Sequence, residues 1–399
     1  MKRFLSAASS RTNTNTTTAT QSSNTSSCRF PIPSISFSGA GFLGVYHAGV
    51  YACLQKHNHV LQPLERLSPD SAKAAPIITG VSAGAIISAA ISAGVTPDAA
   101  MNVVLQVAER TRSKGGLLDV LRPGFSLIDQ LDDLLVLEMQ KALGGSGDQD
   151  SPNDYDNELL LNRIQNGKLL HIGLTDRKKF DVSNTKADLN AYVYADTYRD
   201  MKDICSAAIL SSYIPLGTGP AIWDWSDENI AVKMAWKTVK DMEKEGFLKH
   251  GISRTNVLEG ASQTQSIKKE TEADSDSSDD KDGVDDVLRY LDGGLANLCP
   301  EIDSRTLIVA PINGIYSHPF IAPLAPNIDE DSILEQWKVV KHIEISDRVK
   351  IGLNTQNVVA LYQMARSSSP EVLETKFRDG YDDAKRYLSD HDMLTVYSA

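Results

Sequence analysis

Residues 77–93 read IITGVSAGAIISAAISA, a short apolar run, a turn of small residues and a longer apolar run. The first run has the β-branched content of a buried strand, and the second is apolar at nearly every position, which predicts a helix buried on all sides. Ser82 lies between them in a Gly-x-Ser-x-Gly turn with Gly80 and Gly84. Such a turn between strand and helix holds a serine hydroxyl exposed for nucleophilic attack. A plain packing turn of small residues is the alternative interpretation.

A glycine-rich turn precedes this stretch. Ile35 and Phe37 alternate with serines in a short predicted strand, and a helix is expected to follow the turn. Backbone N–H groups at such a helix start can point at a negative charge. The candidate anion-binding residues of the turn are Gly39, Ala40, Gly41, Phe42 and Gly44.

The same turn also fits a dinucleotide-binding fingerprint. Glu65 lies 21 residues after Gly44, near the place expected for an acid that binds a ribose. The surrounding residues 62–66, QPLER, do not look like the end of a core strand. A nucleotide-binding protein and a purely structural turn both stay open on these residues alone.

A third short motif is the sequence Leu291-Asp292-Gly293-Gly294, which precedes a predicted strand at 306–310. An Asp-Gly-Gly turn is common, so a simple turn is one interpretation. The glycines at 293 and 294 also allow a carboxylate to come close to another backbone. A base that faces a serine turn would need that close approach.

Predicted strands alternate with predicted helices along most of the chain. Residues 169–174 and 306–310 have the composition of core strands. The alternation predicts an α/β fold around a largely parallel sheet. After residue 331 amphipathic helices are expected, for example over residues 333–343 and 357–366.

Composition excludes several classes of function. Forty Lys and Arg against 52 Asp and Glu give a formal charge of −12, which argues against a general electrostatic affinity for nucleic acid.

Nine of the carboxylates fall within residues 270–286, so the rest of the chain is close to neutral. The polar segment 260–286 is expected to be disordered. The four cysteines lie far apart without a Cys-x-x-Cys pair, so neither a disulfide framework nor a metal site is expected.

The N-terminal region is rich in Ser, Thr and Asn, and no acidic residue precedes Glu65. No apolar core follows the first basic residues, so a secretory signal is not expected, whereas an organellar targeting peptide and a plain disordered tail both fit residues 1–30. Two uncharged stretches, 30–55 and 74–97, are interrupted by Gly, Ser or Pro. We therefore expect strand-turn-helix units there rather than membrane spans.

The three motifs, in this order on an α/β chain, resemble the patatin-like phospholipase family. Residues 35–47, ISFSGAGFLGVYH, are similar to its animal lipase branch, the group of adipose triglyceride lipase and adiponutrin. Residues 211–215, SSYIP, and 290–294, YLDGG, fit the same branch. The resemblance covers about residues 33–220 and 287–320.

The resemblance implies a three-layer α/β/α catalytic domain over residues 33–320, with a polar acidic insertion at 226–287 and a helical extension at 331–399. It also implies a catalytic dyad in which Ser82 is the nucleophile and Asp292 accepts its proton, with the Gly-rich turn as oxyanion hole. No metal or cofactor is implied. The implied activity is hydrolysis of glycerolipid esters, triacylglycerol or phospholipid, by an intracellular protein that is cytoplasmic or peripheral at a membrane or lipid-droplet surface. The lipid class, and acyl transfer against hydrolysis, stay open.

Two further interpretations compete with the dyad. A Ser-Asp-His hydrolase would need a histidine after the acid, and the candidates by position are His318, His342 and His391, each of which reads more readily as a surface or packing residue. A lipid-surface scaffold with an idle site would leave both Ser82 and Asp292 without a function.

Overall fold

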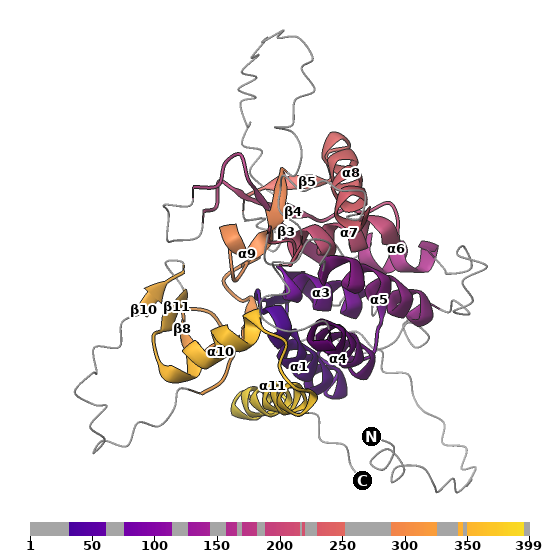
Figure 1. Cartoon of the computed structure of the whole chain (residues 1–399). Helices are drawn as coiled ribbons and strands as arrows, with labels where there is room; N and C mark the ends of the chain where they lie inside the picture. The colour runs from indigo at the N-terminus through magenta and orange to yellow at the C-terminus, as the bar shows by residue number, and fades with distance from the viewer. Residues whose placement is uncertain are drawn as a thin grey trace, which may run out of the picture.

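The computed structural model describes residues 32–60, 76–113, 127–143, 157–165, 170–181, 188–215, 218–219, 230–251, 289–324, 342–345 and 349–394. Within these ranges an eight-stranded sheet forms the centre of the molecule, in the order β5-β4-β3-β2-β1-β7-β9, with β6 also paired to β3 (Figure 1). Its strands are β1 (Ser34–Phe37), β2 (Ile77–Gly80), β3 (Leu170–Asp176), β4 (Tyr192–Ala195), β5 (Leu248–His250), β6 (Tyr290–Asp292), β7 (Leu307–Val309) and β9 (Phe320–Ile321).

Helices surround this sheet, and a small antiparallel sheet lies beside it (Figure 1). The small sheet consists of β8 (Gly314–Tyr316), β10 (His342–Glu344) and β11 (Val349–Gly352). The helices are η1 (Gly41–Leu43), α1 (Gly44–Lys56), α3 (Ala83–Ala93), α4 (Pro97–Ser113), α5 (Leu127–Ala142), α6 (Asn157–Gln165), α7 (Met201–Ser211), α8 (Ile230–Lys244), α9 (Gly293–Ala296), α10 (Thr355–Ala365) and α11 (Pro370–Asp390).

The central sheet is mostly parallel, as predicted. Strands β3, β2, β1, β7 and β9 pair in parallel, whereas β4 and β6 run antiparallel to β3, and β5 antiparallel to β4. Parallel pairing needs crossover connections, and the helices between the strands supply them. The α/β fold class is therefore confirmed.

Both faces of the sheet are covered. Alternate residues of a strand point to opposite faces, and Ile35 and Phe37 of β1 enter the large core that the helices share with the sheet. On the other face, Ile308 packs against the small sheet, and Tyr192 packs with Ala296 of α9. Coverage on both sides explains why all four residues of β1, including its serines, are buried.

Close contact between α1 and α11 ties the C-terminal helix to the start of the domain. A Cβ on Gly49 would lie 1.9 Å from the carbonyl oxygen of Phe377, and one on Gly380 would lie 2.2 Å from that of Tyr46. The two glycines therefore allow the helices to cross with their backbones in contact. The Tyr46 hydroxyl also donates a 2.8 Å hydrogen bond to Asp383. The helix α11 is thus packed onto the domain rather than set apart from it.

Several sequence-based expectations need correction or fall outside the described residues. The helix expected at 333–343 is wrong at its end, because His342 and Ile343 belong to β10, where they pair with β11; residues 331–341 are not described. The segment 226–287, expected to be a polar insertion, contains two elements of the domain. One is α8, whose apolar face packs on α7, and the other is β5, a strand of the central sheet. The N-terminal 31 residues, Glu65 and the acidic run at 270–286 lie outside the described ranges.

The two uncharged stretches form strands, turns and helices of the domain where they are described. Within those ranges no helix combines the length and apolar content that crossing a bilayer requires.

Candidate active site

Ser82 lies in a backbone conformation that few non-glycine residues adopt. It follows β2 and precedes α3, with φ 55° and ψ −131°. Such a conformation costs about 1–3 kcal/mol and persists only where the surroundings hold it. Small neighbours make it sterically feasible: a Cβ on Gly84 would lie 2.2 Å from the carbonyl oxygen of Phe37. The turn therefore lifts the Ser82 side chain away from strand and helix, at the N-terminus of an apolar eleven-residue helix.

A second serine holds this turn in place. The backbone N–H of Ser82 donates a 2.9 Å hydrogen bond to Oγ of Ser211, and that hydroxyl donates a 2.6 Å bond to the carbonyl oxygen of Gly173. The Ser211 side chain is fully buried at the end of α7. One hydroxyl therefore links the serine turn to β3.

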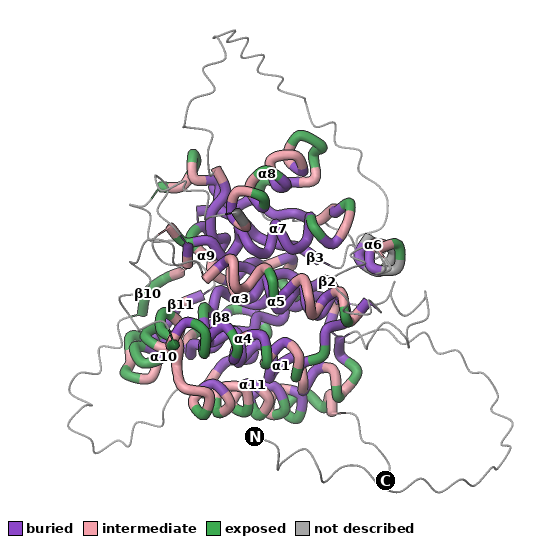
Figure 2. Tube along the Cα trace, turned by 45° about the vertical axis from the view of Figure 1, so that its right-hand side comes forward, coloured by how far each residue is buried: buried purple, intermediate pink, exposed green. Residues whose placement is uncertain are grey.

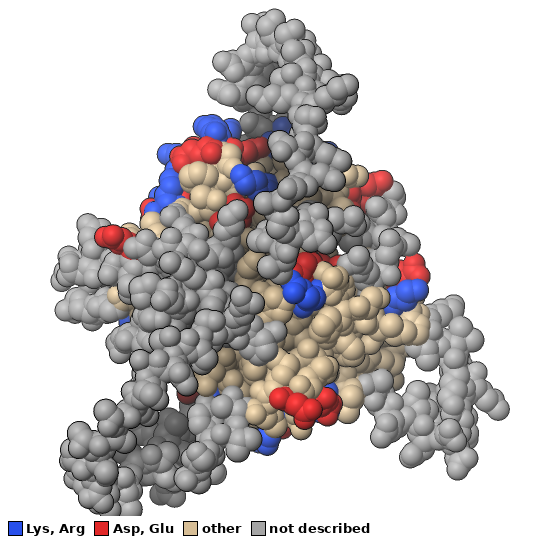
Figure 3. Space-filling model, turned by 180° about the vertical axis from the view of Figure 1, so that it is seen from behind, with Lys and Arg blue, Asp and Glu red and all other residues tan. Residues whose placement is uncertain are grey.

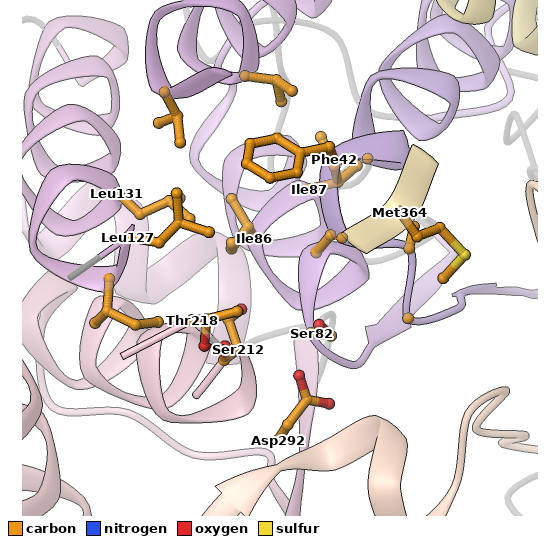
Figure 4. Close-up of a pocket in the computed structure, with 18 of the residues that line it drawn as sticks. Phe42, Ser82, Ile86, Ile87, Leu127, Leu131, Ser212, Thr218, Asp292 and Met364 are labelled. Carbon is orange, nitrogen blue, oxygen red and sulfur yellow. Dashed lines mark hydrogen bonds between the residues drawn. The ribbon is translucent and has the colours of Figure 1, made fainter. Parts of the chain in front are cut away.

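Strand pairing explains how Asp292 reaches Ser82 across 210 positions of sequence. β3 pairs with β2 through Ile172 and with β6 from Leu174 onward. β4 occupies the opposite edge of β3 over the same residues, so β6 lies on the edge of β3 where β2 ends. Because Ser82 follows the end of β2 and Asp292 ends β6, the two side chains come together, and they point toward one another in Figure 4.

The Asp292 carboxylate is buried and only partly satisfied. Its Oδ1 accepts a 2.7 Å hydrogen bond from the N–H of Gly294, whereas Oδ2 has no full hydrogen-bond partner among the described residues. Burial raises the pKa of Asp292 from 3.8 to about 7, although the nearby Ser82 hydroxyl and the Gly294 N–H both oppose this rise. The hydroxyl of Thr175 fixes the backbone by donating a 2.6 Å bond to the Asp292 carbonyl oxygen.

The Gly-rich turn lies beside the same two residues, but its members are not equivalent. The N–H of Gly39 donates to the carbonyl oxygen of Leu298 at 3.1 Å, and that of Gly44 donates to Gly41. The N–H groups of Ala40, Gly41 and Phe42 have no partner among the described residues. Of the five expected anion-binding residues, these three therefore retain donors for a ligand.

Ser82, Asp292 and the Gly-rich turn line one cavity of about 730 Å³. The remainder of its wall is largely apolar, and most of it comes from α3, α4, α5 and α10 (Figure 4). Examples are Ile86 of α3, Val103 of α4 and Leu131 of α5. The volume lies in the range of small-molecule sites. The site can thus hold a long apolar group with a polar atom near Ser82.

Comparison with known proteins agrees with this architecture. The patatin-like phospholipase family model matches residues 35–302, about two thirds of the chain. The chain belongs to the patatin-like phospholipase family.

Two relatives illustrate the family match. The human protein named 1-acylglycerol-3-phosphate O-acyltransferase PNPLA3 is 21% identical over 361 residues, which are 90% of this chain and 50% of that protein. Rat patatin-like phospholipase domain-containing protein 2 is 34% identical over 103 residues, which are 26% of this chain and 19% of that protein. The matched stretches thus span half or less of these curated relatives, and the predicted resemblance to the animal branch is confirmed.

The histidines that a triad would require do not line the cavity of this patatin-like domain. His318 is buried, with Nε2 2.9 Å from a Glu301 oxygen and Nδ1 3.2 Å from the Ser304 carbonyl oxygen. His342 lies in β10, not in the expected helix, and His391 follows the end of α11. None of the three is among the described residues that line the cavity.

Two supporting residues of this patatin-like site were not predicted in that role. Ser211 lies in the segment SSYIP, which carries the family resemblance, so a signal for it was present in the sequence. Thr175 is an ordinary strand residue, and only the pairing of β3 with β6 explains its contact with Asp292. The described residues contain no cluster of His, Cys, Asp and Glu placed to hold a metal ion.

Proposed function

We propose that the protein is a lipid acyl hydrolase in which Ser82 is the nucleophile and Asp292 the general base. The observation that carries this proposal is the placement of both side chains in the wall of one largely apolar cavity. An ester whose acyl chain fills the cavity would bring its carbonyl carbon next to the Ser82 hydroxyl.

The reaction balances with these two residues and water. Ser82 Oγ attacks the ester carbonyl carbon while its proton passes to the Asp292 carboxylate. The tetrahedral intermediate collapses, the bond to the leaving alcohol breaks, and Asp292 returns the proton to that alcohol. Water then attacks the acyl-enzyme, gives its proton to Asp292 and releases the fatty acid, with the proton returned to Ser82.

Burial makes Asp292 a usable base. An ordinary aspartate has a pKa near 3.9 and little tendency to take a proton at neutral pH. A pKa of about 7 lies close to the operating pH, where general bases are most effective. The unsatisfied Oδ2 is the atom that would accept the proton, because Oδ1 is already bonded to Gly294.

The oxyanion would be stabilised by backbone donors. The N–H groups of Ala40, Gly41 and Phe42 are free of partners among the described residues, and the N-terminus of α3 adds its positive end beside Ser82. Each such donor is worth on the order of 10²–10³ in rate. The family match and the apolar wall favour glycerolipid esters, triacylglycerol or phospholipid, as substrates.

A decisive experiment incubates the full chain with a mixed glycerolipid extract and follows which species disappear. Ser82→Ala and Asp292→Asn should each abolish ester loss, whereas Ser212→Ala should retain most of it. Ser212 also lines the cavity, but its hydroxyl only bonds the Ala208 carbonyl oxygen within α7. Retained turnover in Ser82→Ala would end the proposal.

Two further readouts separate the alternatives. A fluorophosphonate probe should label the wild type and not Ser82→Ala; absence of labelling in both would favour an idle scaffold. Thermal stabilisation by NAD or FAD would favour a nucleotide-binding protein. Addition of a lysophospholipid acceptor distinguishes acyl transfer from hydrolysis, since transfer yields a new diacyl lipid in place of free fatty acid.

A further inference from the structure

The helix α10 exposes an unusual apolar stripe. Val358, Leu361 and Tyr362 are 57%, 45% and 51% exposed, and Ala365 is exposed as well. Their spacing of three, four and seven residues places them on one side of the helix. Residues 351–365 contain no Asp, Glu, Lys or Arg, whereas ten of the 21 residues of the adjacent α11 are charged. A contiguous exposed apolar surface of this kind marks an interaction site.

Another side of α10 is already packed against the domain, so the helix does not need the stripe in order to be held in place. Asn357 is buried, and its amide group donates to the carbonyl oxygens of Asn313 and Gly352 at 2.8 and 2.7 Å. Ala360 packs against Ala40 and Leu43 of the Gly-rich turn. The helix is therefore fixed directly to the candidate oxyanion hole, with its stripe facing outward at the edge of the molecule (Figure 2).

The stripe continues into the wall of the cavity. Leu361 and Ala365 line the cavity and are also exposed. Leu295 after Asp292 and Ile214 after α7 do the same, with exposed fractions of 39% and 37%. Apolar side chains from three separate segments are thus both exposed at the surface and part of the cavity wall.

Charged side chains lie outside the stripe. Figure 3, the view from behind, shows Lys, Arg, Asp and Glu side by side at the top of the molecule and in smaller groups lower down. Near the stripe the nearest cation in sequence is Arg366, whose guanidinium lies over the Tyr362 ring. An uncharged apolar face beside an apolar opening suits the interfacial region of a lipid layer better than a strongly charged partner.

We infer that the α10 stripe, together with Leu295 and Ile214, docks the protein on a phospholipid surface with the cavity opening against the lipid. This inference rests on the proposed function, because it explains how a long acyl chain reaches Ser82. Each methylene group of the acyl chain that has to leave lipid for water lowers the equilibrium constant of that transfer about fourfold. An opening sealed against the lipid lets the chain slide from one apolar medium into another.

The test measures binding of the full chain to phosphatidylcholine vesicles by flotation, in a Ser82→Ala background so that no turnover occurs. Val358→Glu should weaken binding about tenfold or more. Val358→Trp should strengthen it, because indole rings favour the membrane interface. Val358 does not line the cavity, and glutamate is a better helix former than valine, so the helix is preserved.

Met234→Glu is the matched control. Met234 is 51% exposed on α8, remote from the cavity lining, so its replacement should leave binding within about twofold. In proteins with Ser82 intact, Val358→Glu should keep full activity on a short-chain, water-soluble ester while losing activity on vesicles.

Several results would overturn the inference. Wild-type-like vesicle binding by Val358→Glu, equal losses in Val358→Glu and Met234→Glu, or no binding by the parent protein would each do so. A parent dimer that Val358→Glu converts to a monomer would assign the stripe to a second copy of the chain instead. Failure of the proposed function shows separately, as ester hydrolysis that survives Ser82→Ala.

Discussion

Replacing Asp292 by asparagine should stabilise the folded protein at neutral and alkaline pH. The pKa of the carboxyl is about 7 in the folded protein and about 3.9 in an unfolded chain. The folded state therefore holds a proton that the unfolded state releases between these values, so the free energy of unfolding falls as pH rises through this window. A gap of about three pKa units corresponds to about 4 kcal/mol at most. Asparagine carries no charge, so the variant does not lose this free energy of unfolding as the pH rises.

The measurement is urea unfolding of wild type and Asp292→Asn at pH 4.5 and pH 8. Near pH 4.5 the two should differ little, because Asp292 is protonated in the folded protein and asparagine can still accept from the Gly294 N–H. At pH 8 the variant should be more stable by about 2–4 kcal/mol, while ester hydrolysis is lost.

Asp176→Asn is the matched control, since this buried carboxylate on the adjacent strand is paired with Arg289 at 2.9 Å. Breaking that pair should destabilise the protein at pH 8, the opposite sign. An Asp292→Asn protein no more stable than wild type at pH 8, or a difference independent of pH, would refute the electrostatic reasoning.

Three further outcomes follow from the same geometry. The kcat/KM for a soluble ester should fall about tenfold per pH unit below about pH 7, because only ionised Asp292 accepts the proton; a pH-independent rate would exclude it as the base. Ser211→Ala should lower kcat and cost about 1–3 kcal/mol of stability, because the buried Ser82 N–H and Gly173 carbonyl lose their partner; unfolding and initial-rate measurements check both. His318→Gln should retain ester hydrolysis, measured on the same substrate, and loss of activity in a folded variant would revive the triad.

Local sequence pattern was enough to predict the strand-turn-helix units of the fold. The apolar run that follows Ser82 predicts the helix α3, whose positions leave no polar face and which Gly94 ends in the left-handed conformation. The sequence pattern predicts a helix to residue 343 where the structure has the strand β10, because three residues are too short for a periodic signal. Its pairing with β11 is a tertiary effect that no local pattern contains. The sequence pattern does not predict the helix α8, because it lies in the segment 226–287, which is polar overall. Its apolar positions nevertheless pack on α7.

The site was predictable as a set of residues and not as an arrangement. Glycine patterns around Ser82 and Asp292 indicated where a nucleophile and a carboxylate could be exposed. The sequence could not indicate that Gly39 donates its N–H to Leu298, because that contact depends on the fold around residue 298. Nor could it indicate the pKa of Asp292, which follows from burial that only the assembled cavity supplies.

The close packing of α1 on α11 at Gly49 and Gly380 has a consequence for synthesis on the ribosome. α1 carries the Gly-rich turn at its start, and one of the surfaces against which it packs is provided by residues 370–390. Until α11 leaves the exit tunnel, one side of α1 stays uncovered. A chain cut shortly before residue 370 would therefore keep Ser82, Asp292 and the Gly-rich turn but leave that side of α1 open to solvent.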